Sequence, residues 1–309
     1  MSSDESLRTR FRGALLGVAV GDGLGAPFEG TPSVPADELA RLELEEEAGP
    51  LRYTDDTHMT IGLARSLLEC GGFDGAHMAT RFAADFSAEP WRGYGPGPPR
   101  VFALLAQGEP WDQAAVSLFG GSGSFGNGAA MRVAPVALFT FPDVFRAARL
   151  ARQTARITHS HELGMEGAAL QAAAVAQLLG YAPGDRFDRR FFLAALRTHV
   201  ASDVYLHKLG LMEELLRGAR PEEVVAGLGN GIAASESVPT ALFAFLRHPG
   251  SFVDAVRYAI SLGGDTDTIA SMTGALSGAY LGEGAIPAWW RENVEGASVL
   301  RSLADELLG

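Results

Sequence analysis

Residues 7–25 read LRTRFRGALLGVAVGDGLG, and this stretch carries the pattern that decides the expected fold. Its apolar side chains recur at three- and four-residue spacing, at Leu7, Phe11, Leu15 and Val18. This spacing predicts a helix with one buried face. Three glycines recur every four residues on another line of the same helix, at Gly13, Gly17 and Gly21. Because each glycine costs a helix up to ~1 kcal/mol relative to alanine, this line indicates that a second helix packs closely against it.

The rest of the chain alternates between helical patterns and turns of small residues. Helices are expected at 38–47, 61–68, 76–86, 145–156, 166–179, 191–200, 204–216, 238–246, 253–262, 268–280 and 298–308. The period-two alternation of strands is almost absent, and neither a fixed repeat nor an interdomain linker is recognisable. The sequence therefore predicts an all-α fold of about ten or more helices. Residues 1–309 are expected to form a single compact domain.

The composition limits which binding partners and which cellular compartment are expected. The 309 residues contain 25 Lys and Arg against 37 Asp and Glu, and the resulting net charge of −12 disfavours nucleic acid as a partner. Lys208 is the only lysine and Cys70 the only cysteine, so a lysine-bound cofactor is disfavoured and no disulfide can form within the chain. Cys70 is expected in the core. The acidic start and the lack of a long apolar stretch predict a cytoplasmic protein without a membrane partner.

Two acidic clusters precede predicted helices. Residues 54–57 read TDDT and residues 265–268 read DTDT. Either cluster alone is typical of a helix N-cap. If the two converge, four carboxylates share one site, where two like charges ~4 Å apart repel by about 4 kcal/mol at an effective dielectric of ~20. A divalent cation removes this repulsion, and an all-oxygen ligand set suits Mg²⁺, Mn²⁺ or Ca²⁺ rather than zinc.

Glu29 and two histidines are less decisive on their own. Glu29 follows the first helix and is either a fifth carboxylate of the same site or an ordinary surface residue. His159 and His161 have the spacing of a metal pair. Because no second set of nitrogen ligands accompanies them, an ordinary hydrogen-bonded or surface role is favoured for both.

A glycine-rich loop is the next candidate binding feature. Residues 120–128 read GGSGSFGNG and contain the dinucleotide-binding spacing GxGxxG. We reject a dinucleotide-binding fold because no strand is predicted before the loop and Pro135 leaves too little room for the helix that should follow. The glycines still free the amides of residues 124–128 to approach an anion such as phosphate. Phe119 and Phe125 flank the loop and either stack on a base or belong to the core.

Several longer strings of residues resemble one enzyme family. They are FRGALLG at 11–17, GDGLG at 21–25, YTDDT at 53–57, GSFGNGAAMR at 123–132, TH at 158–159 and GGDTDTIA at 263–270. From about residue 10 to residue 285 the chain resembles the ADP-ribosylglycohydrolases, the family of dinitrogenase-reductase-activating glycohydrolase. RGYG at 92–95 and LGNGIAASESVPT at 228–240 are similar to the ADP-ribosylhydrolase 3 branch, which removes serine-linked ADP-ribose.

The resemblance implies a compact all-α domain of orthogonal helices, with two Mg²⁺ ions, or Mn²⁺ as an alternative, at the base of an ADP-ribose cleft. The metal ligands it implies are Thr54, Asp55, Asp56, Asp265, Asp267 and Thr268. The catalytic residues it implies are Glu29, on a mobile loop over the metals, and Asp56. The substrate-binding residues it implies are Phe119, Gly123, Ser124, Phe125, Gly126, Asn127, His159 and Ile232. Phe125 replaces a tyrosine common in the branch, so stacking is retained and a hydroxyl contact is lost.

The expected function is Mg²⁺-dependent hydrolysis of the O-glycosidic bond of ADP-ribosyl adducts, with release of ADP-ribose. The expected partners are ADP-ribose and ADP-ribosylated proteins or peptides, and the chain is expected to be a monomer. Serine-linked ADP-ribose is the first candidate substrate, beside O-acetyl-ADP-ribose and poly-ADP-ribose. Three alternatives stay open: an arginine-linkage hydrolase, a metal phosphohydrolase that cuts the diphosphate, and a non-catalytic ADP-ribose-binding protein.

Overall fold

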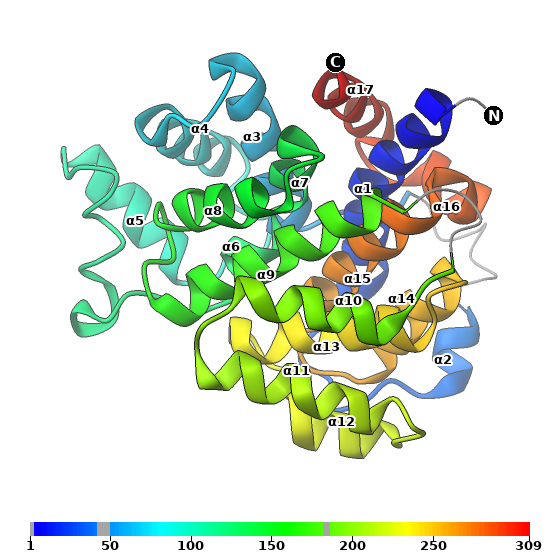
Figure 1. Ribbon diagram of the computed structural model, residues 1–309. Coiled ribbons are helices and arrows are strands. Elements are labelled where there is room, and N and C mark those ends of the chain that lie inside the picture. The colour runs from blue at the N-terminus through cyan, green and yellow to red at the C-terminus, as the bar shows by residue number, and fades with distance from the viewer. Residues whose placement is uncertain (1–2, 42–49, 182–185) are drawn as a thin grey trace.

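The computed structural model describes residues 3–41, 50–181 and 186–309, which form helices, turns and two isolated bridges but no strands (Figure 1). The α-helices are α1 (Ser3–Gly25), α2 (Ala36–Arg41), α3 (Asp55–Cys70), α4 (Gly75–Ala88), α5 (Gly97–Ala106), α6 (Gly128–Met131), α7 (Ala134–Thr140), α8 (Val144–Ala155), α9 (Glu162–Leu179), α10 (Arg189–Leu196), α11 (Asp203–Leu215), α12 (Pro221–Leu228), α13 (Ala234–Arg247), α14 (Phe252–Ser261), α15 (Thr266–Leu281), α16 (Ala288–Asn293) and α17 (Ala297–Leu308). Shorter 3₁₀-helices are η1 (Ala26–Phe28), η2 (Leu118–Gly121), η3 (Arg197–His199) and η4 (Glu283–Ala285). The predicted all-α fold is confirmed.

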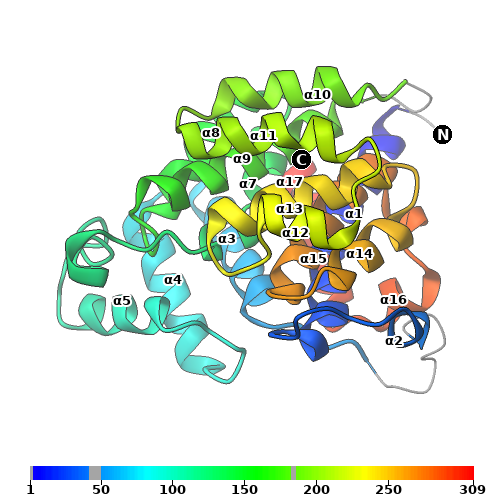
Figure 2. The same cartoon turned by 90° about the horizontal axis from the view of Figure 1, so that it is seen from below.

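Helices α1 and α15 lie side by side at the centre of the molecule (Figures 1 and 2). The glycine line of α1 faces α15, since a Cβ atom on Gly17 would lie 2.1 Å from the carbonyl oxygen of Gly274. At the end of α1, a Cβ atom on Gly25 would lie 2.5 Å from the carbonyl oxygen of Thr266 at the start of α15. The predicted close approach of a second helix is therefore confirmed. The two helices run antiparallel, so the end of α1 lies beside the start of α15.

The other helices pack around this central pair. Helix α9 is buried over nearly its whole length and contacts α8, α13 and α15. Helix α3 packs against α4, α7 and α17, and the amide of Thr54 before its first residue donates a hydrogen bond to Asp22 of α1. This contact brings the start of α3 to the same region as the start of α15. The two predicted acidic clusters therefore lie at the same end of the central helix pair.

Helices α5, α7, α12 and α16 are among those that lie outside the segments predicted to be helical. The first three carry proline in the first turn, namely Pro98, Pro135 and Pro221, and α16 follows Pro287. Proline is compatible with this position because the amide there has no partner within the helix. The helix that follows the glycine-rich loop, α6, is only four residues long and ends at Met131, and Pro135 lies in the first turn of the next helix, α7. The expectation that too little room is left for a crossover helix is therefore confirmed. The dinucleotide-binding fold is excluded for a second reason, because the residues described before the glycine-rich loop form no strand.

Of two smaller predictions, one is wrong and the other extends beyond the described residues. Cys70 is exposed, so its expected place in the core is wrong. It lies in the last turn of α3, beyond the buried run that ends at Leu67, and Gly71 ends the helix in the left-handed conformation. Of the helix predicted at 38–47, residues up to 41 belong to α2, and 42–47 lie outside the described residues. None of the helices that the structure describes is both long and apolar enough to cross a membrane.

Candidate functional site

The two acidic clusters meet at the starts of α3 and α15. Thr54 is the N-cap of α3, and its hydroxyl oxygen accepts a hydrogen bond of 3.4 Å from the amide of Asp56. Asp265 is the N-cap of α15, but its side chain makes no capping hydrogen bond. The hydroxyl of Thr268 donates a hydrogen bond of 3.3 Å to the Asp56 carboxylate. The two clusters therefore converge, and capping does not account for the Asp265 side chain.

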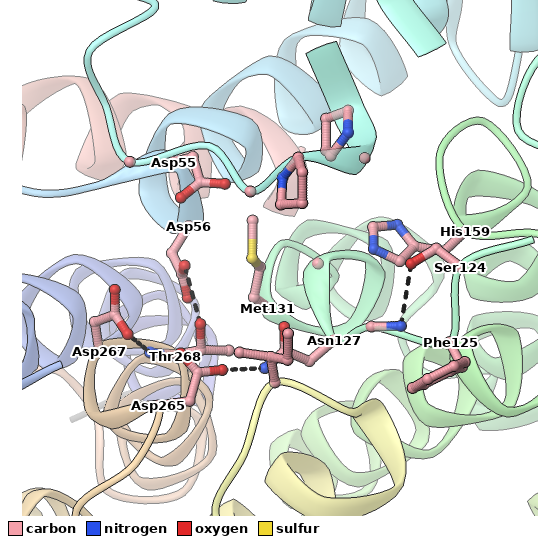
Figure 3. Close-up of a pocket in the computed structure, with 18 of the residues that line it drawn as sticks. Asp55, Asp56, Ser124, Phe125, Asn127, Met131, His159, Asp265, Asp267 and Thr268 are labelled. Atoms are coloured by element: carbon pink, nitrogen blue, oxygen red, sulfur yellow. Dashed lines mark hydrogen bonds between the residues drawn. The ribbon is translucent and has the colours of Figure 1, made fainter. Parts of the chain in front are cut away.

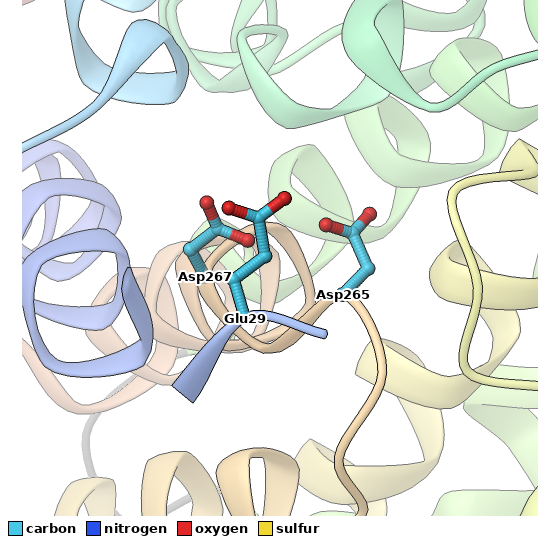
Figure 4. Close-up of side chains that lie close together, drawn as sticks. All are labelled: Glu29, Asp265 and Asp267. Atoms are coloured by element: carbon cyan, nitrogen blue, oxygen red, sulfur yellow. The ribbon is translucent and has the colours of Figure 1, made fainter. Parts of the chain in front are cut away.

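Glu29 joins the second cluster. It follows η1 directly after the end of α1, and the next residue, Gly30, donates a backbone hydrogen bond of 2.8 Å to the carbonyl of Gly264. This bond holds the Glu29 segment against the turn before Asp265. One carboxylate oxygen from each of Glu29, Asp265 and Asp267 lies within 4.8 Å of the other two. Figure 4 shows these three side chains close together. Glu29 is exposed to solvent, yet its carboxylate belongs to the acidic site rather than to an isolated surface position.

Burial and mutual repulsion disfavour ionisation of these carboxyl groups. Burial, and then the charges of Asp22 and Asp267, raise the pKa of Asp56 well above its ordinary value. Burial and then Asp265 raise the pKa of Asp267 to about 7, and the charge of Asp267 raises the pKa of Glu29. A buried oxygen of Asp56, Oδ1, has no hydrogen-bond partner among the described residues. Nor does any Lys, Arg or His in the described part of the chain form an ion pair with these acids. Such a cluster fits a cation, which lowers the pKa values of its ligands.

Asp22 is an acidic residue of this region to which the sequence analysis assigned no role. Its side chain is fully buried in α1, and it accepts hydrogen bonds from the amides of Thr54 at 3.0 Å and Thr57 at 3.1 Å. The hydroxyl of Thr57 also donates to it, at 2.6 Å. These bonds fix the start of α3 against α1. The signal in the sequence is an aspartate that directly follows Gly21 in an otherwise apolar stretch of helix.

The glycine-rich loop is held beside the acidic cluster. The amide of Asn127 donates to the carbonyl of Ile232 at 2.9 Å, and the amide of Ala234 donates to the carbonyl of Phe125 at 3.0 Å. The side-chain amide of Asn127 donates a short hydrogen bond to the Asp265 carboxylate. Backbone pairing thus fixes the position of Ile232, while Asn127 connects the loop to the acids.

A cavity of about 300 Å³ lies between these elements, at the lower end of the range for small-molecule pockets. Its lining includes most of the predicted site residues, namely Glu29, Asp55, Asp56, Phe119, Ser124, Phe125, Gly126, Asn127, His159, Ile232, Asp265, Asp267 and Thr268. Figure 3 shows the acidic side chains at one end of this cavity and Ser124, Phe125 and His159 at the other. We call these the acidic end and the aromatic end. Thr54 and Gly123, the two other predicted site residues, are not part of the cavity lining. Gly123 approaches the neighbouring segment closely, because a Cβ atom there would lie 2.1 Å from the Ser160 hydroxyl oxygen.

The aromatic end contains apolar side chains that the fold leaves uncovered. Phe119 and Phe125 are each 51% exposed and Ile232 is 69% exposed, so the interpretation of the two rings as core residues is wrong. His159 is buried, and its Nδ1 atom lies 2.8 Å from the Thr158 hydroxyl. Burial, with a smaller contribution from the charge of Arg132, lowers the pKa of His159 to about 3. The imidazole is therefore neutral, as expected for a hydrogen-bonded histidine.

Comparison with known proteins identifies the family of the chain. The sequence profile described as ADP-ribosylglycohydrolase matches residues 3–309. The chain belongs to the ADP-ribosylglycohydrolase family. It is 41% identical to the mouse ADP-ribosylhydrolase ARH3 over an alignment of 337 positions, which covers 97% of this chain and 91% of the mouse protein. It is 32% identical to an uncharacterized protein of Archaeoglobus fulgidus, over 97% of this chain and 96% of that protein. A solved structure titled ADP-ribosylglycohydrolase-related protein complex has a TM-score of 0.76 and 30% identity, covering 98% of both chains.

Membership of the ADP-ribosylglycohydrolase family makes the chain a hydrolase that acts on ADP-ribosyl groups.

One wall of the cavity was not predicted from the sequence. This wall is the segment between α4 and α5 and the first residues of α5, and its lining residues are Gly93, Gly95, Pro96, Gly97 and Pro98. The string RGYG marked this segment as similar to the ADP-ribosylhydrolase 3 branch. Glycine has no side chain and proline has an apolar one, so neither residue type indicated a binding role.

Proposed function

We propose that the chain is a Mg²⁺-dependent hydrolase that cleaves the O-glycosidic bond of ADP-ribosyl adducts and releases ADP-ribose. One observation carries the proposal: a single cavity has carboxylates at one end and a glycine-rich loop with exposed aromatic rings at the other (Figure 3). In ADP-ribose, a diphosphate separates adenosine from a second ribose, which carries the bond to be cleaved. The order of groups along the cavity suits this order along the ligand. The 41% identity to the mouse ADP-ribosylhydrolase ARH3 supports the same reaction class.

The acidic end fits divalent cations. The unpartnered Oδ1 atom of Asp56, the raised pKa values and the all-oxygen character of the cluster favour a hard cation over zinc. We assign two Mg²⁺ ions, or Mn²⁺ in their place, to ligands among Thr54, Asp55, Asp56, Asp265, Asp267 and Thr268. When bound, the ions would supply Lewis acidity and positive charge near the distal ribose.

The other residues of the cavity position the rest of the ligand. The diphosphate is assigned to the loop of Ser124, Gly126 and Asn127, because glycine-rich loops let backbone amides approach phosphate oxygens. The adenine ring is assigned to Phe119 and Phe125, whose exposed rings offer stacking faces. His159 and Ile232 line the same end, and Gly123 holds the loop against Ser160.

Glu29 is assigned the proton transfer. The reaction breaks the bond between the anomeric carbon and the leaving oxygen, and it forms a bond from that carbon to a water oxygen. The leaving oxygen gains a proton and the attacking water loses one. Glu29 lines the cavity at the acidic end, and the charge of Asp267 raises its pKa, which favours proton exchange closer to neutral pH. A positioned acid or base contributes roughly 10²–10⁴-fold in rate. Asp56, hydrogen-bonded to Thr268, is the second carboxylate assigned to catalysis.

Serine-linked ADP-ribose is the proposed first substrate, because the strings at 92–95 and 228–240 are similar to the serine-linkage branch. The test offers a serine-ADP-ribosylated peptide, an arginine-ADP-ribosylated protein and O-acetyl-ADP-ribose side by side, each with Mg²⁺ and with a chelator. We expect Mg²⁺-dependent release of free ADP-ribose from the serine adduct and none from the arginine adduct. AMP as the product would instead indicate a phosphohydrolase. Binding of ADP-ribose without release from any adduct would indicate a non-catalytic binding protein.

A matched pair of variants tests the assignment of Glu29. Glu29→Gln should lower the turnover of the serine adduct by at least about 100-fold, in line with the loss of a proton-transfer group. Its affinity for ADP-ribose, measured by calorimetry, should change little. Glu38→Gln, at an exposed glutamate of α2, is the control and should behave as wild type. Normal turnover in Glu29→Gln would remove this residue from the mechanism.

A further inference from the structure

Trp91 lies in the turn between α4 and α5, one residue before the RGYG string. Its side chain is 71% exposed, more than any other large apolar side chain in the described part of the chain. Exposure of one apolar side chain is ordinary in a folded protein. Trp91 has two further features: it lies near the cavity, and its backbone is held in place by the contacts of the neighbouring Arg92.

The distance from Trp91 to the acidic end is limited by the chain itself. A Cβ atom on Gly93 would lie 3.7 Å from Oδ1 of Asp55 and 3.8 Å from Cβ of Thr54. The Cα atom of Gly93 is one bond farther away, and Trp91 is two residues before it, at most ~3.8 Å per residue. The Cα atom of Trp91 therefore lies within about 13 Å of the Asp55 carboxylate. The indole is within reach of a few residues of an extended peptide bound at this end.

In chain order, Trp91 is closer to the acidic end of the cavity than to the aromatic end. A Cβ atom on Gly97 would lie 3.9 Å from Cδ1 of Leu118, next to Phe119 at the aromatic end. From Gly93 to Gly97 the chain thus runs along the cavity, from the acidic end toward the aromatic end. Trp91 precedes Gly93 by two residues and is not part of the cavity lining, so it lies outside the cavity near its acidic end. ADP-ribose in the cavity would point its distal ribose, and the group attached to it, toward this side.

Arg92 makes the turn rigid. Its guanidinium group donates to both carboxylate oxygens of Glu295, at 2.7 and 2.8 Å, and to the carbonyl oxygen of Tyr53 at 3.0 Å. It also bonds Glu89 and lies 4.2 Å from the centre of the Tyr53 ring. A bidentate arginine pair of this kind holds its backbone in one orientation. The Trp91 backbone is therefore fixed before any partner binds, which reduces the entropy lost on binding.

We propose that Trp91 is a docking residue for the polypeptide part of an ADP-ribosylated protein, and that its indole packs on the chain that flanks the modified residue. This inference rests on the function proposed above, and it adds a contact that acts on the leaving group rather than on ADP-ribose. A polypeptide is the occupant because this side of the cavity is where the leaving group of a protein adduct must extend. A tryptophan face offers a large contact area at a low cost in side-chain entropy. This contact favours the binding of protein adducts over adducts that carry a small leaving group.

The test compares two substrates that differ only in the leaving group: a serine-ADP-ribosylated peptide of about ten residues and O-acetyl-ADP-ribose. The variants are Trp91→Ala, the conservative Trp91→Phe and a control, Phe191→Ala, at a 68% exposed aromatic residue of α10 that is not part of the cavity lining. For Trp91→Ala we expect a KM for the peptide about tenfold higher, equal to about 1.4 kcal/mol, with little change in kcat. Its kinetics on O-acetyl-ADP-ribose should stay within about twofold of wild type. Trp91→Phe should restore most of the peptide affinity, and Phe191→Ala should match wild type on both substrates.

The outcomes separate this inference from the function on which it rests. An active enzyme in which Trp91→Ala leaves the peptide KM unchanged overturns the docking role alone. Equal losses on both substrates also overturn it, because they indicate that Trp91 only supports the cavity wall. A wild-type protein that releases ADP-ribose from neither substrate with Mg²⁺ overturns the proposed function and the docking role together.

Discussion

Replacing Gly17 by alanine tests whether the close packing of α1 on α15 holds the fold together. A Cβ atom at this position would lie 2.1 Å from the carbonyl oxygen of Gly274 and 2.6 Å from its carbonyl carbon. Both atoms belong to helix backbone, so neither can rotate away as a side chain could. The two helices must move apart, and contacts made along the whole pair weaken as they do.

The magnitude follows from two opposing effects. Overpacking of a buried contact costs about 1–3 kcal/mol, and a backbone collision belongs at the upper end of this range. Alanine returns up to ~1 kcal/mol in helix propensity. The expected net loss in the free energy of unfolding is therefore about 2 kcal/mol. With an unfolding entropy of about 2.1 cal/mol/K per residue, the 309 residues give about 0.65 kcal/mol/K, so Tm should fall by about 3 °C.

The control is Gly210→Ala in α11, where the same substitution meets no backbone. A Cβ atom there would lie 3.2 Å from Nη2 of Arg197, the end of a flexible side chain. Only the propensity gain should remain, so this variant is expected to be more stable than wild type by up to ~1 kcal/mol. Urea denaturation followed by circular dichroism, with calorimetry for Tm, compares the two variants. If Gly17→Ala proves as stable as Gly210→Ala, the glycine line does not determine the packing of the helix pair.

Two further predictions concern the buried acids. Asp22→Ala should lower Tm by about 3–9 °C, because it leaves the amides of Thr54 and Thr57 without an acceptor, at about 1–3 kcal/mol each; an unchanged melting curve would show that these bonds do not fix α3. Burial, together with other effects at each site, raises the pKa of Asp22 and of Asp267 from 3.8 to about 7. Between about pH 4 and 7, the metal-free folded chain therefore binds more protons than the unfolded chain. Its stability should fall as pH rises through this window, by at most about 1.4 kcal/mol per pH unit for each group. Melting in chelator from pH 5 to pH 8 should show this fall and Mg²⁺ should reduce it, whereas identical profiles with and without Mg²⁺ would argue against a metal at these acids.

What could be predicted from the sequence was what local patterns encode. The glycine line of α1 is visible because helical spacing repeats every four residues, and the acids stand out because they occur where helices start. The role of Asp22 was not predictable in this way, since its partner Thr54 lies 32 residues later and the hydrogen bond depends on how α3 packs. The wall formed by residues 93–98 was missed for a different reason. Its contribution comes from backbone shape, which leaves little chemical signal in the side chains.

Charge balance connects the fold to the proposed metals. Antiparallel packing of α1 on α15, with α3 tied to Asp22, places two helix N-termini and five cavity-lining carboxylates at one end of one cavity, with the Asp22 carboxylate beside them. Each helix N-terminus carries roughly half a positive charge, so the two together offset only about one of these negative charges. Two divalent cations would neutralise most of the remaining charge, and they would do so at the end of the cavity where the distal ribose is assigned. Protonation offers an alternative way to neutralise the acids, but it leaves Asp56 with a buried oxygen that lacks a partner. The same helix packing that creates the cavity therefore makes the cluster unfavourable without cations and favourable with them.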